Sequence, residues 1–236
     1  EMELEGISAD PITLLCTLKA CGSIGAIERV QEIHAEIKKW GFLERSLVVG
    51  STLVDIYAKC GSLDLAQEVF DSVQVRDVVL WTTLIAGYAE HGYGEKALWS
   101  FEQMQLEGIP PNAVTLICIL KACGNTGAIE MGKQIHSKIL SSGMLKKSSV
   151  LGTALVDMYV KCGMLAKAQQ VLDDLPIQDA ISWNALIAGY AQQGLCDEAL
   201  GCYDRMRSEG LSPDAVTFTC ILKACGSTKA IGKGKL

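Results

Sequence analysis

Residues 81–112 read WTTLIAGYAEHGYGEKALWSFEQMQLEGIPPN, and this stretch decides the fold. Its first half carries an apolar stripe with the i, i+3, i+4, i+7 spacing of one helix face: Trp81, Leu84, Ile85 and Tyr88. A second stripe follows the glycines at 92 and 94: Ala97, Leu98, Phe101 and Met104. Gly108 and the two prolines after it read as a helix stop. The stretch therefore predicts a hairpin of two short helices.

The same plan recurs along the chain with an offset of 102 residues, most visibly in LKACG at 18–22, 120–124 and 222–226. Self-similarity of this kind is the signature of repeat architecture. Each period holds three repeats, of 36, 31 and 35 residues. We assign the end of an earlier repeat to 1–10, then whole repeats to 11–46, 47–77, 78–112, 113–148, 149–179 and 180–214, and a partial repeat to 215–236. The chain therefore reads as a piece of a longer protein.

A hairpin of this size cannot cover its own apolar faces, so neighbouring hairpins must stack. We expect an all-α fold, an α-α superhelix (solenoid) of helix-turn-helix hairpins. The 236 residues are 49% hydrophobic, which favours a folded chain, and no stretch approaches the roughly 20 apolar residues of a membrane span. The net charge of -6 has the wrong sign for a protein held to nucleic acid mainly by a basic surface.

The ten cysteines mostly follow the repeat, so we expect buried packing for nearly all of them and neither a disulfide framework nor a metal site. His34 and His136 occupy equivalent positions without a recurring nucleophile or carboxylate, and we expect packing or surface roles. Trp81 and Trp183 begin apolar stripes and are expected in the core. No cofactor is implied by any of these residues.

The alternation of 36, 31 and 35 residues, with LKACGNTGAIEMGKQIH at 120–136 and ALVDMYVKCG at 154–163, resembles the PLS class of plant pentatricopeptide repeat proteins. In that class the 35-residue repeats are called P, the longer ones L and the short ones S. The resemblance implies an organellar protein, of the mitochondrion or chloroplast, that binds single-stranded RNA. It also implies that the protein specifies sites of cytidine-to-uridine editing.

In the family, bases are selected by the fifth and last residues of each P or S repeat, and the second residue is inserted between bases. The implied reading pairs are Ser51 with Asp77, Thr82 with Asn112, Thr153 with Asp179, and Asn184 with Asp214. The implied wedges are Val48, Val79, Val150 and Ile181. From spacing alone, the polar residues are equally well explained as base readers and as ordinary first-turn residues and helix caps.

A carboxylate only accepts hydrogen bonds, so a last-position Asp suits the imino donors of guanine and uracil, whereas Asn also donates and suits adenine and cytosine. At the fifth position, short Ser or Thr leaves room for a purine, and Asn reaches toward a pyrimidine. With RNA running 5′ to 3′ along the chain, as in the family, the repeats predict guanine, adenine, an unspecified base, guanine, then uracil or cytosine. The L repeats carry Leu15 and Ile117 at the fifth position and should accept any base. Asp10, at the end of an earlier repeat, predicts guanine or uracil.

Lys59 and Lys161 recur at the end of a first helix, where contact with phosphate and a solvated helix end are equally good interpretations. No nucleophile, carboxylate pair or phosphate loop recurs, and no His-x-Glu with Pro-Cys-x-x-Cys zinc deaminase signature occurs. We therefore expect a binding module, with any deaminase in a further C-terminal domain or a partner. The alternative is a protein-interaction scaffold. The L repeats are candidates for contact with editing-complex proteins.

Overall fold

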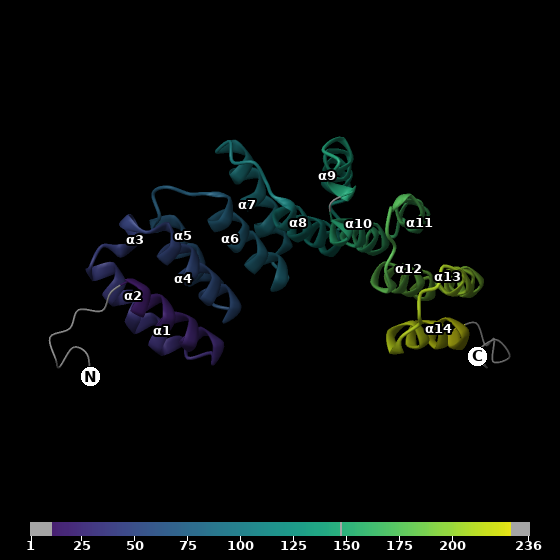
Figure 1. Ribbon diagram of the computed structural model, residues 1–236, viewed down its shortest axis with the longest axis horizontal. Coiled ribbons are helices and arrows are strands. Elements are labelled where there is room, and N and C mark those ends of the chain that lie inside the picture. The colour runs from purple at the N-terminus through teal and green to yellow at the C-terminus, as the bar shows by residue number, and fades with distance from the viewer. Residues whose placement is uncertain (1–10, 147, 228–236) are drawn as a thin grey trace. The chain divides into compact units, whose positions relative to one another are not determined.

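The computed structural model describes residues 11–146 and 148–227, and every regular element in these residues is a helix (Figure 1). This confirms the all-α helical-repeat prediction. The chain divides into two compact halves, residues 1–118 and 119–236, which we describe separately. The candidate reader Asp10 and the rest of the end segments 1–10 and 228–236 lie outside the described residues.

The N-terminal half contains α1 (Pro11–Ser23), α2 (Ile27–Lys39), α3 (Phe42–Arg45), α4 (Leu47–Lys59), α5 (Leu63–Ser72), α6 (Val78–Glu90) and α7 (Gly94–Leu106). Helix α8 (Ala113–Thr126) crosses the boundary between the halves. The C-terminal half continues with α9 (Ile129–Ser141), the 3-10 helix η2 (Met144–Lys146), α10 (Ser149–Lys161), α11 (Leu165–Asp174), α12 (Ala180–Gln192), α13 (Cys196–Ser208) and α14 (Ala215–Ser227).

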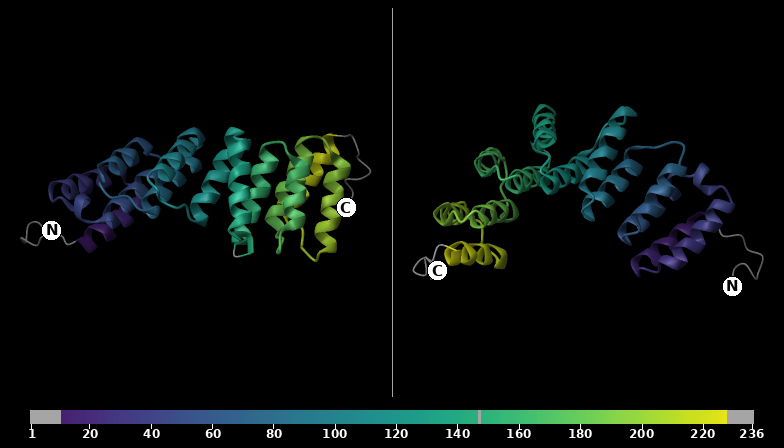
Figure 2. Two further views of the ribbon diagram at one scale, coloured as in Figure 1. Left: turned by 90° about the horizontal axis from the view of Figure 1, so that it is seen from above. Right: turned by 180° about the vertical axis from the view of Figure 1, so that it is seen from behind.

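The helices of each half form stacked hairpins (Figures 1 and 2). In the N-terminal half the first helices α1, α4 and α6 pack side by side, and α2, α5 and α7 each pack on the first helix of their own hairpin. In the C-terminal half α10, α12 and α14 pack side by side, with α11 and α13 behind them. Hairpin stacking is therefore confirmed within each half, and each half has an inner row of first helices.

The apolar stripes predicted from periodicity form the core of the hairpins. All four residues of the first stripe are buried on α6, and the Trp81 ring meets the Phe70 ring edge-on at a centroid distance of 4.5 Å. The indole N–H of Trp81 donates to Glu107 Oε2 at 3.0 Å, and that of Trp183 donates to Gln178 Oε1 at 3.1 Å. Both tryptophans therefore lie in the core, as expected, with their polar edge satisfied.

The turns differ from the sequence-based prediction in two details. Gly92 has φ of 81°, a left-handed conformation that ends α6, whereas Gly94 does not break a helix but begins α7. The 36-residue repeats add a short helical turn after their second helix, α3 in one case and η2 in the other. Each addition follows a glycine with φ of 66°, Gly41 or Gly143. These turns have no apolar periodicity and were not predicted.

Close approach of two first helices explains a glycine in the middle of α6. A Cβ at Gly87 would lie 2.7 Å from the Cβ of Ala58, which is fixed to the α4 backbone and cannot rotate away. We expect Gly87→Ala to destabilise the protein by about 1–3 kcal/mol, because the helices must separate. Gly201→Ala is the matched control, since nothing lies within 4 Å of that Cβ, and it should stabilise α13 by about 0.5–1 kcal/mol. Urea unfolding of both variants measures the difference, and equal effects would contradict the packing.

Two recurring histidines join neighbouring hairpins, which confirms the packing interpretation. His34 Nδ1 lies 3.1 Å from the Tyr57 hydroxyl, and His136 Nδ1 lies 2.9 Å from the Tyr159 hydroxyl. Burial lowers the pKa of both imidazoles and raises the pKa of Tyr57 to about 12. Both partners are therefore neutral at pH 7, and each contact is a neutral hydrogen bond within one half of the chain.

The expectation that nearly all ten cysteines are buried is wrong. Cys16 is exposed and half of the cysteines are only partly covered, because the first helices turn one flank to solvent. Within residues 11–146 and 148–227, no helix combines the length and apolar character that crossing a membrane requires.

Candidate nucleic-acid interface

The candidate wedges lie on the surface of the first helices. Val48 on α4 is 62% exposed and Val79 on α6 is 52% exposed, and Val150 and Ile181 are exposed to a similar degree. The second residues of the 36-residue repeats share this exposure: Ile12, Val114 and Val216. Each half therefore presents β-branched apolar side chains at one position of successive first helices. These side chains contribute little to the core and are available for contact with a ligand.

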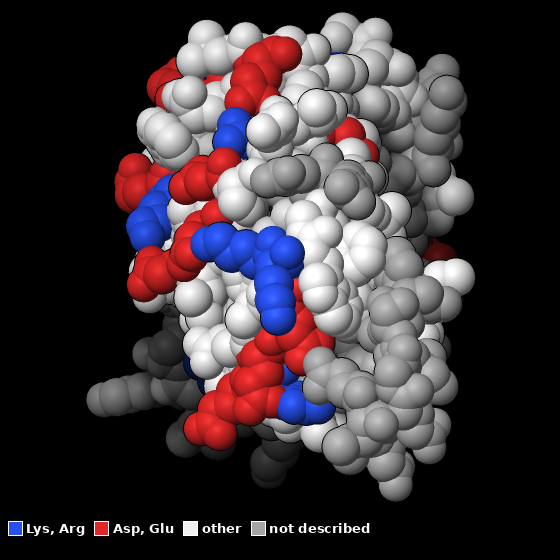
Figure 3. All heavy atoms as spheres, turned by 90° about the vertical axis from the view of Figure 1, so that its left-hand side faces the viewer, with Lys and Arg blue, Asp and Glu red and all other residues white. Residues whose placement is uncertain are grey.

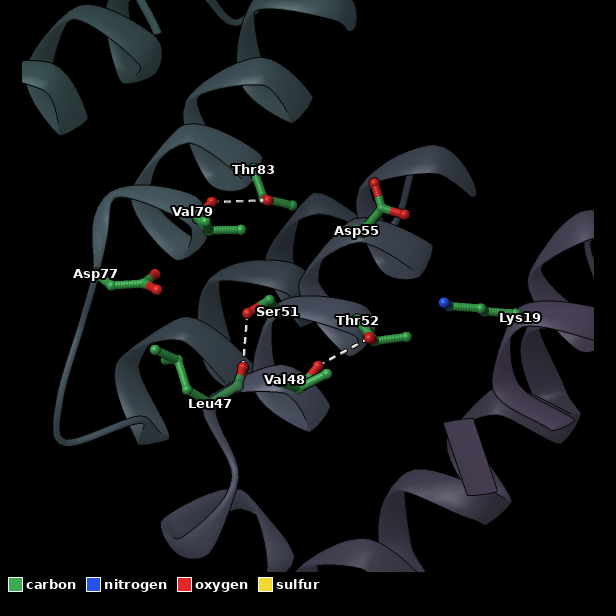
Figure 4. Close-up of a pocket in the computed structure, with 9 residues that line it drawn as sticks. All are labelled: Lys19, Leu47, Val48, Ser51, Thr52, Asp55, Asp77, Val79 and Thr83. Atoms are coloured by element: carbon green, nitrogen blue, oxygen red, sulfur yellow. Dashed lines mark hydrogen bonds between the residues drawn. The ribbon is translucent and has the colours of Figure 1, made fainter. Parts of the chain in front are cut away.

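A hollow of about 410 Å³ lies between two of these wedges in the N-terminal half (Figure 4). It is lined by Lys19, Leu47, Val48, Ser51, Thr52, Asp55, Asp77, Val79 and Thr83. In Figure 4 the Asp77 carboxylate points inward from one side, and Lys19 of α1 lies on the opposite side. The structure thus brings a predicted reading pair, Ser51 and Asp77, to one hollow bordered by Val48 and Val79.

Asp77 is the N-cap of α6, which confirms the helix-cap interpretation of this residue. Its Oδ1 accepts from the backbone N–H of Leu80 at 2.9 Å. The Ser51 hydroxyl donates to the Leu47 carbonyl at 2.6 Å and makes no bond to Asp77. One carboxylate oxygen of Asp77 is therefore occupied by the cap, and Oδ2 is left toward the hollow.

The equivalent pair in the C-terminal half is joined directly. The Thr153 hydroxyl donates to Asp179 Oδ2 at 3.2 Å and also to the Ser149 carbonyl at 3.3 Å. Asp179 Oδ1 caps α12 through the backbone N–H of Ser182 at 2.8 Å, within a capping box. The two roles of the carboxylate are thus divided between its two oxygens.

The pair Thr82 and Asn112 is joined through a third residue, Thr115 of α8. The Thr82 and Thr115 hydroxyls lie 2.6 Å apart, and Asn112 Oδ1 accepts from the backbone N–H of Thr115 at 2.9 Å. Thr82 is only 8% exposed, whereas Asn112 is exposed. A smaller hollow of about 180 Å³ reaches Thr82 beside Val114. The last residue of this repeat is therefore the member more open to a ligand.

The pair Asn184 and Asp214 is in direct contact, with Asn184 Nδ2 3.1 Å from Oδ1 and 3.2 Å from Oδ2 of the carboxylate. Asn184 is 7% exposed and Asp214 is exposed. The backbone N–H of Thr217 and, after it, the Asn184 amide hold the pKa of Asp214 below its usual value. Asp214 is therefore an ionised acceptor at neutral pH.

Sequence reasoning missed Thr115 and Thr217, which are fully buried beside these two pairs. The signal was present, because Asn-x-x-Thr at 112–115 and Asp-x-x-Thr at 214–217 resemble the spacing of a capping box. Their contact with residue 82 or 184 has no such signal, since 33 residues separate the partners. Leu15 and Ile117, at the fifth position of the 36-residue repeats, are half-buried and apolar.

The candidate phosphate contacts are ion-paired. Lys59 Nζ lies 2.7 Å from Asp55 Oδ2, and Lys161 Nζ lies 2.8 Å from Asp157 Oδ2, each one turn back on its own helix. The described residues on the face in Figure 3 carry basic and acidic side chains next to one another, without a continuous basic field. Across residues 11–146 and 148–227, no cluster of three or more His, Cys, Asp or Glu side chains is placed to bind a metal ion. The two candidate lysines are therefore already engaged by carboxylates of their own helices.

Comparison with known proteins identifies relatives of this chain. The family model described as "PPR repeat family" matches residues 76–125 and 178–227, and the model described as "PPR repeat" matches 51–78 and 153–176. A pentatricopeptide repeat-containing protein of Arabidopsis thaliana is 40% identical over 229 residues, covering 97% of this chain and 31% of its own length. Two others, named as chloroplastic and mitochondrial, are 39% and 35% identical and are covered over 36% and 41% of their lengths.

The chain thus spans about a third of the length of these relatives. Among solved structures, the pentatricopeptide repeat protein PPR10 in complex with an 18-nt psaJ RNA element superposes with a TM-score of 0.79. The match covers 99% of this chain and 35% of PPR10 at 21% sequence identity. This likeness agrees with the stacked helical hairpins of both halves.

Proposed function

Because the chain belongs to the pentatricopeptide repeat family, we propose that it binds single-stranded RNA and selects bases through its fifth-position and last-position side chains. The observation that carries this proposal is the hollow between Val48 and Val79, where the polar pair Ser51 and Asp77 meets a space bordered by exposed apolar side chains. A planar base has two apolar faces and a polar edge. Such a space suits a base whose faces contact the valines and whose edge meets the carboxylate.

The four last-position residues supply the polarity that base selection requires. Asp77, Asp179 and Asp214 offer acceptors, which suit the imino N–H of guanine or uracil, and Asn112 can donate to a ring nitrogen of adenine or cytosine. The RNA complex of the structurally similar PPR10 supports the same class of ligand. The 36-residue repeats, with apolar Leu15 and Ile117 at the fifth position, place no constraint on their base.

The proposal that this RNA binding serves RNA editing rests on the repeat lengths. The alternation of 36, 31 and 35 residues supports membership of the PLS class, and with it the specification of sites for cytidine-to-uridine editing. Relatives named as mitochondrial and chloroplastic support an organellar location of either kind. In this account the segment binds and orients RNA, and the deamination is carried out by another domain or a partner. Editing-complex proteins would contact the 36-residue repeats.

A second candidate function is a scaffold for other proteins, and one observation favours it. Trp99 is 57% exposed and Leu106 is 79% exposed, both on α7, a second helix. Exposed large apolar side chains seven residues apart lie on one face of a helix and suit contact with a protein. This surface is distinct from the wedges, which lie on first helices.

Titration by fluorescence anisotropy separates the two functions. The whole chain is mixed with labelled single-stranded RNA that carries guanine, adenine, any base, guanine and uracil in order, and with the same RNA as a duplex. We expect binding to the single strand and at least tenfold weaker binding to the duplex, because paired bases cannot enter between the wedges. Equal and negligible binding to both would leave the scaffold as the function.

Salt dependence measures how much of the affinity is electrostatic. For single-stranded RNA, the logarithm of the association constant falls as the logarithm of the salt concentration rises, with a slope of about −0.7 for each phosphate that the protein neutralises. Because Lys59 and Lys161 are already paired with carboxylates, we expect a shallow slope, and Lys59→Met with Lys161→Met should make it shallower still by at most about 1.4. The measurement is the dissociation constant between about 50 and 200 mM salt. A slope unchanged by the double substitution would show that these lysines do not contact phosphate.

A further inference from the structure

Two buried threonine hydroxyls connect the members of two predicted reading pairs. Thr115 and Thr217 are the third residues of α8 and α14, and both are 0% exposed. They lie 102 residues apart, at the third position of the repeats that begin at residues 113 and 215. Each hydroxyl contacts both the fifth and the last residue of the repeat before it. A buried hydroxyl with several polar partners constrains the hydrogen-bonding direction of each of them.

At Thr217 the contacts fix the orientation of the Asn184 amide. Asn184 Nδ2 faces the Asp214 carboxylate, because the opposite orientation would place the amide oxygen against two carboxylate oxygens. Asn184 Oδ1 must then accept from the Thr217 hydroxyl, at 2.6 Å. Asp214 Oδ1 accepts the capping hydrogen bond from the Thr217 backbone N–H at 2.9 Å. In the described part of the chain Asp214 Oδ2 accepts only from Asn184, so it is the oxygen with capacity for a base donor.

Thr115 occupies the same position in its repeat as Thr217, but the group beside it that faces a ligand is a hydrogen-bond donor instead of an acceptor. Asn112 Oδ1 accepts from both the backbone N–H and the hydroxyl of Thr115, at 2.9 and 3.1 Å. The amide oxygen is thereby held against the helix, and the Asn112 NH₂ group is turned away from Thr115. The Thr82 and Thr115 hydroxyls lie 2.6 Å apart, and either of them can be the donor. The bond from the Thr115 backbone N–H to Asn112 Oδ1 leaves the Asn112 NH₂ group with donors for a ligand.

We propose that Thr115 and Thr217 are positioning residues for base selection by the preceding repeat. This inference rests on the proposed RNA-binding function. Thr217 holds Asn184 and Asp214 so that a carboxylate oxygen is presented to the base, and Thr115 holds Thr82 and Asn112 so that an amide donor is presented. The repeats that begin at residues 113 and 215 therefore take part in reading the base of the repeat before them.

The 31-residue repeats supply an internal comparison. Asp179 is held by the Ser182 hydroxyl at 2.8 Å and by Thr153, whereas Asp77 has Leu80 at the corresponding place and no hydroxyl contact. The Ser51 hydroxyl is turned to its own helix. The account therefore expects sharper base discrimination at the nucleotide assigned to Thr153 and Asp179 than at the one assigned to Ser51 and Asp77.

The test uses Thr217→Val, which keeps the shape and removes the hydroxyl, and Thr217→Ser, which keeps the hydroxyl. Dissociation constants are measured for RNAs with each of the four bases at the nucleotide assigned to Asn184 and Asp214, and at the nucleotide assigned to Thr153 and Asp179. We expect Thr217→Val to reduce the preference for uracil at the first nucleotide by about 3- to 10-fold and to leave the second unchanged. Thr217→Ser should keep both preferences.

Three results would overturn the inference. If Thr217→Val weakens the binding of all four RNAs by the same factor and keeps the base preference, Thr217 has only a structural role. If Thr217→Ser loses the preference as fully as Thr217→Val, the hydroxyl is not the cause. If the unchanged chain shows no base preference, the proposed function fails and the inference fails with it. Thermal melting followed by circular dichroism shows whether Thr217→Val folds. Thr115→Val repeats the test at an independent site, with dissociation constants measured for RNAs that differ at the nucleotide assigned to Thr82 and Asn112.

Discussion

Asn184→Thr combined with Asp214→Asn should change the preferred base at the assigned nucleotide from uracil or cytosine to adenine. The double variant reproduces the Thr82 and Asn112 pair on the same scaffold, since Thr217 occupies the place that Thr115 has beside that pair. A carboxylate acceptor is replaced by an amide donor, so the imino N–H of uracil loses its partner and a ring nitrogen of adenine gains one. Hydrogen bonds to charged groups contribute about 1.5–3 kcal/mol, or roughly 10- to 100-fold in affinity.

Dissociation constants for RNAs that differ at this one nucleotide measure the change. The control is the reverse exchange, Thr82→Asn with Asn112→Asp, which should convert a preference for adenine into one for uracil at its own nucleotide. Neither exchange should affect the guanine assigned to Thr153 and Asp179. A preference that stays with uracil after the first exchange would show that these side chains do not read the base.

Val48→Asp combined with Val79→Asp should weaken RNA binding by about tenfold or more. Both side chains border the hollow in Figure 4 and are more than half exposed, so the substitutions remove apolar contact with a base and add two negative charges beside the phosphates. Both positions lie in the first turn of a helix, where a carboxylate is favourable. Stability should therefore change by less than about 1 kcal/mol.

Leu106→Asp is the matched control for the wedges. Leu106 is exposed on α7, a second helix, and its substitution adds one carboxylate, as each of the two wedge substitutions does, away from the first helices. Anisotropy titration should show RNA affinity within about twofold of the unchanged chain for Leu106→Asp. An equal loss of binding free energy per added charge in the two proteins would mean that net charge, and not the wedge position, controls binding.

The fold was predictable because its signal is periodic. The stripe from Trp81 to Tyr88 recurs with the offset of the repeat, and burial of one helix face leaves a pattern that sequence alone displays. The exposed second-position side chains were identified through the family resemblance, and periodicity does not mark them. The short helix α3 and the exposure of Cys16 were missed, because neither depends on a repeating apolar pattern.

The sequence was sufficient to name the residues of the reading pairs, but not to predict the hydrogen bonds that connect them. The sequence shows Asp214 as a helix-cap candidate, and the structure shows that Oδ1 accepts the capping bond while both oxygens contact the Asn184 amide. It also shows Asn184 only 7% exposed and in contact with both Thr217 and Asp214. Such contacts join residues about 30 positions apart on different helices. They depend on how two hairpins stack, for which single-sequence patterns carry no signal.

Selection from a library of random single-stranded RNA, followed by sequencing of the bound molecules, tests the central claim most directly. The account predicts enrichment of guanine, adenine, any base, guanine and then uracil or cytosine, in that order from 5′ to 3′. The third position should stay random, because Ile117 cannot form a hydrogen bond with a base. Bound RNA with the base composition of the starting library would contradict the account.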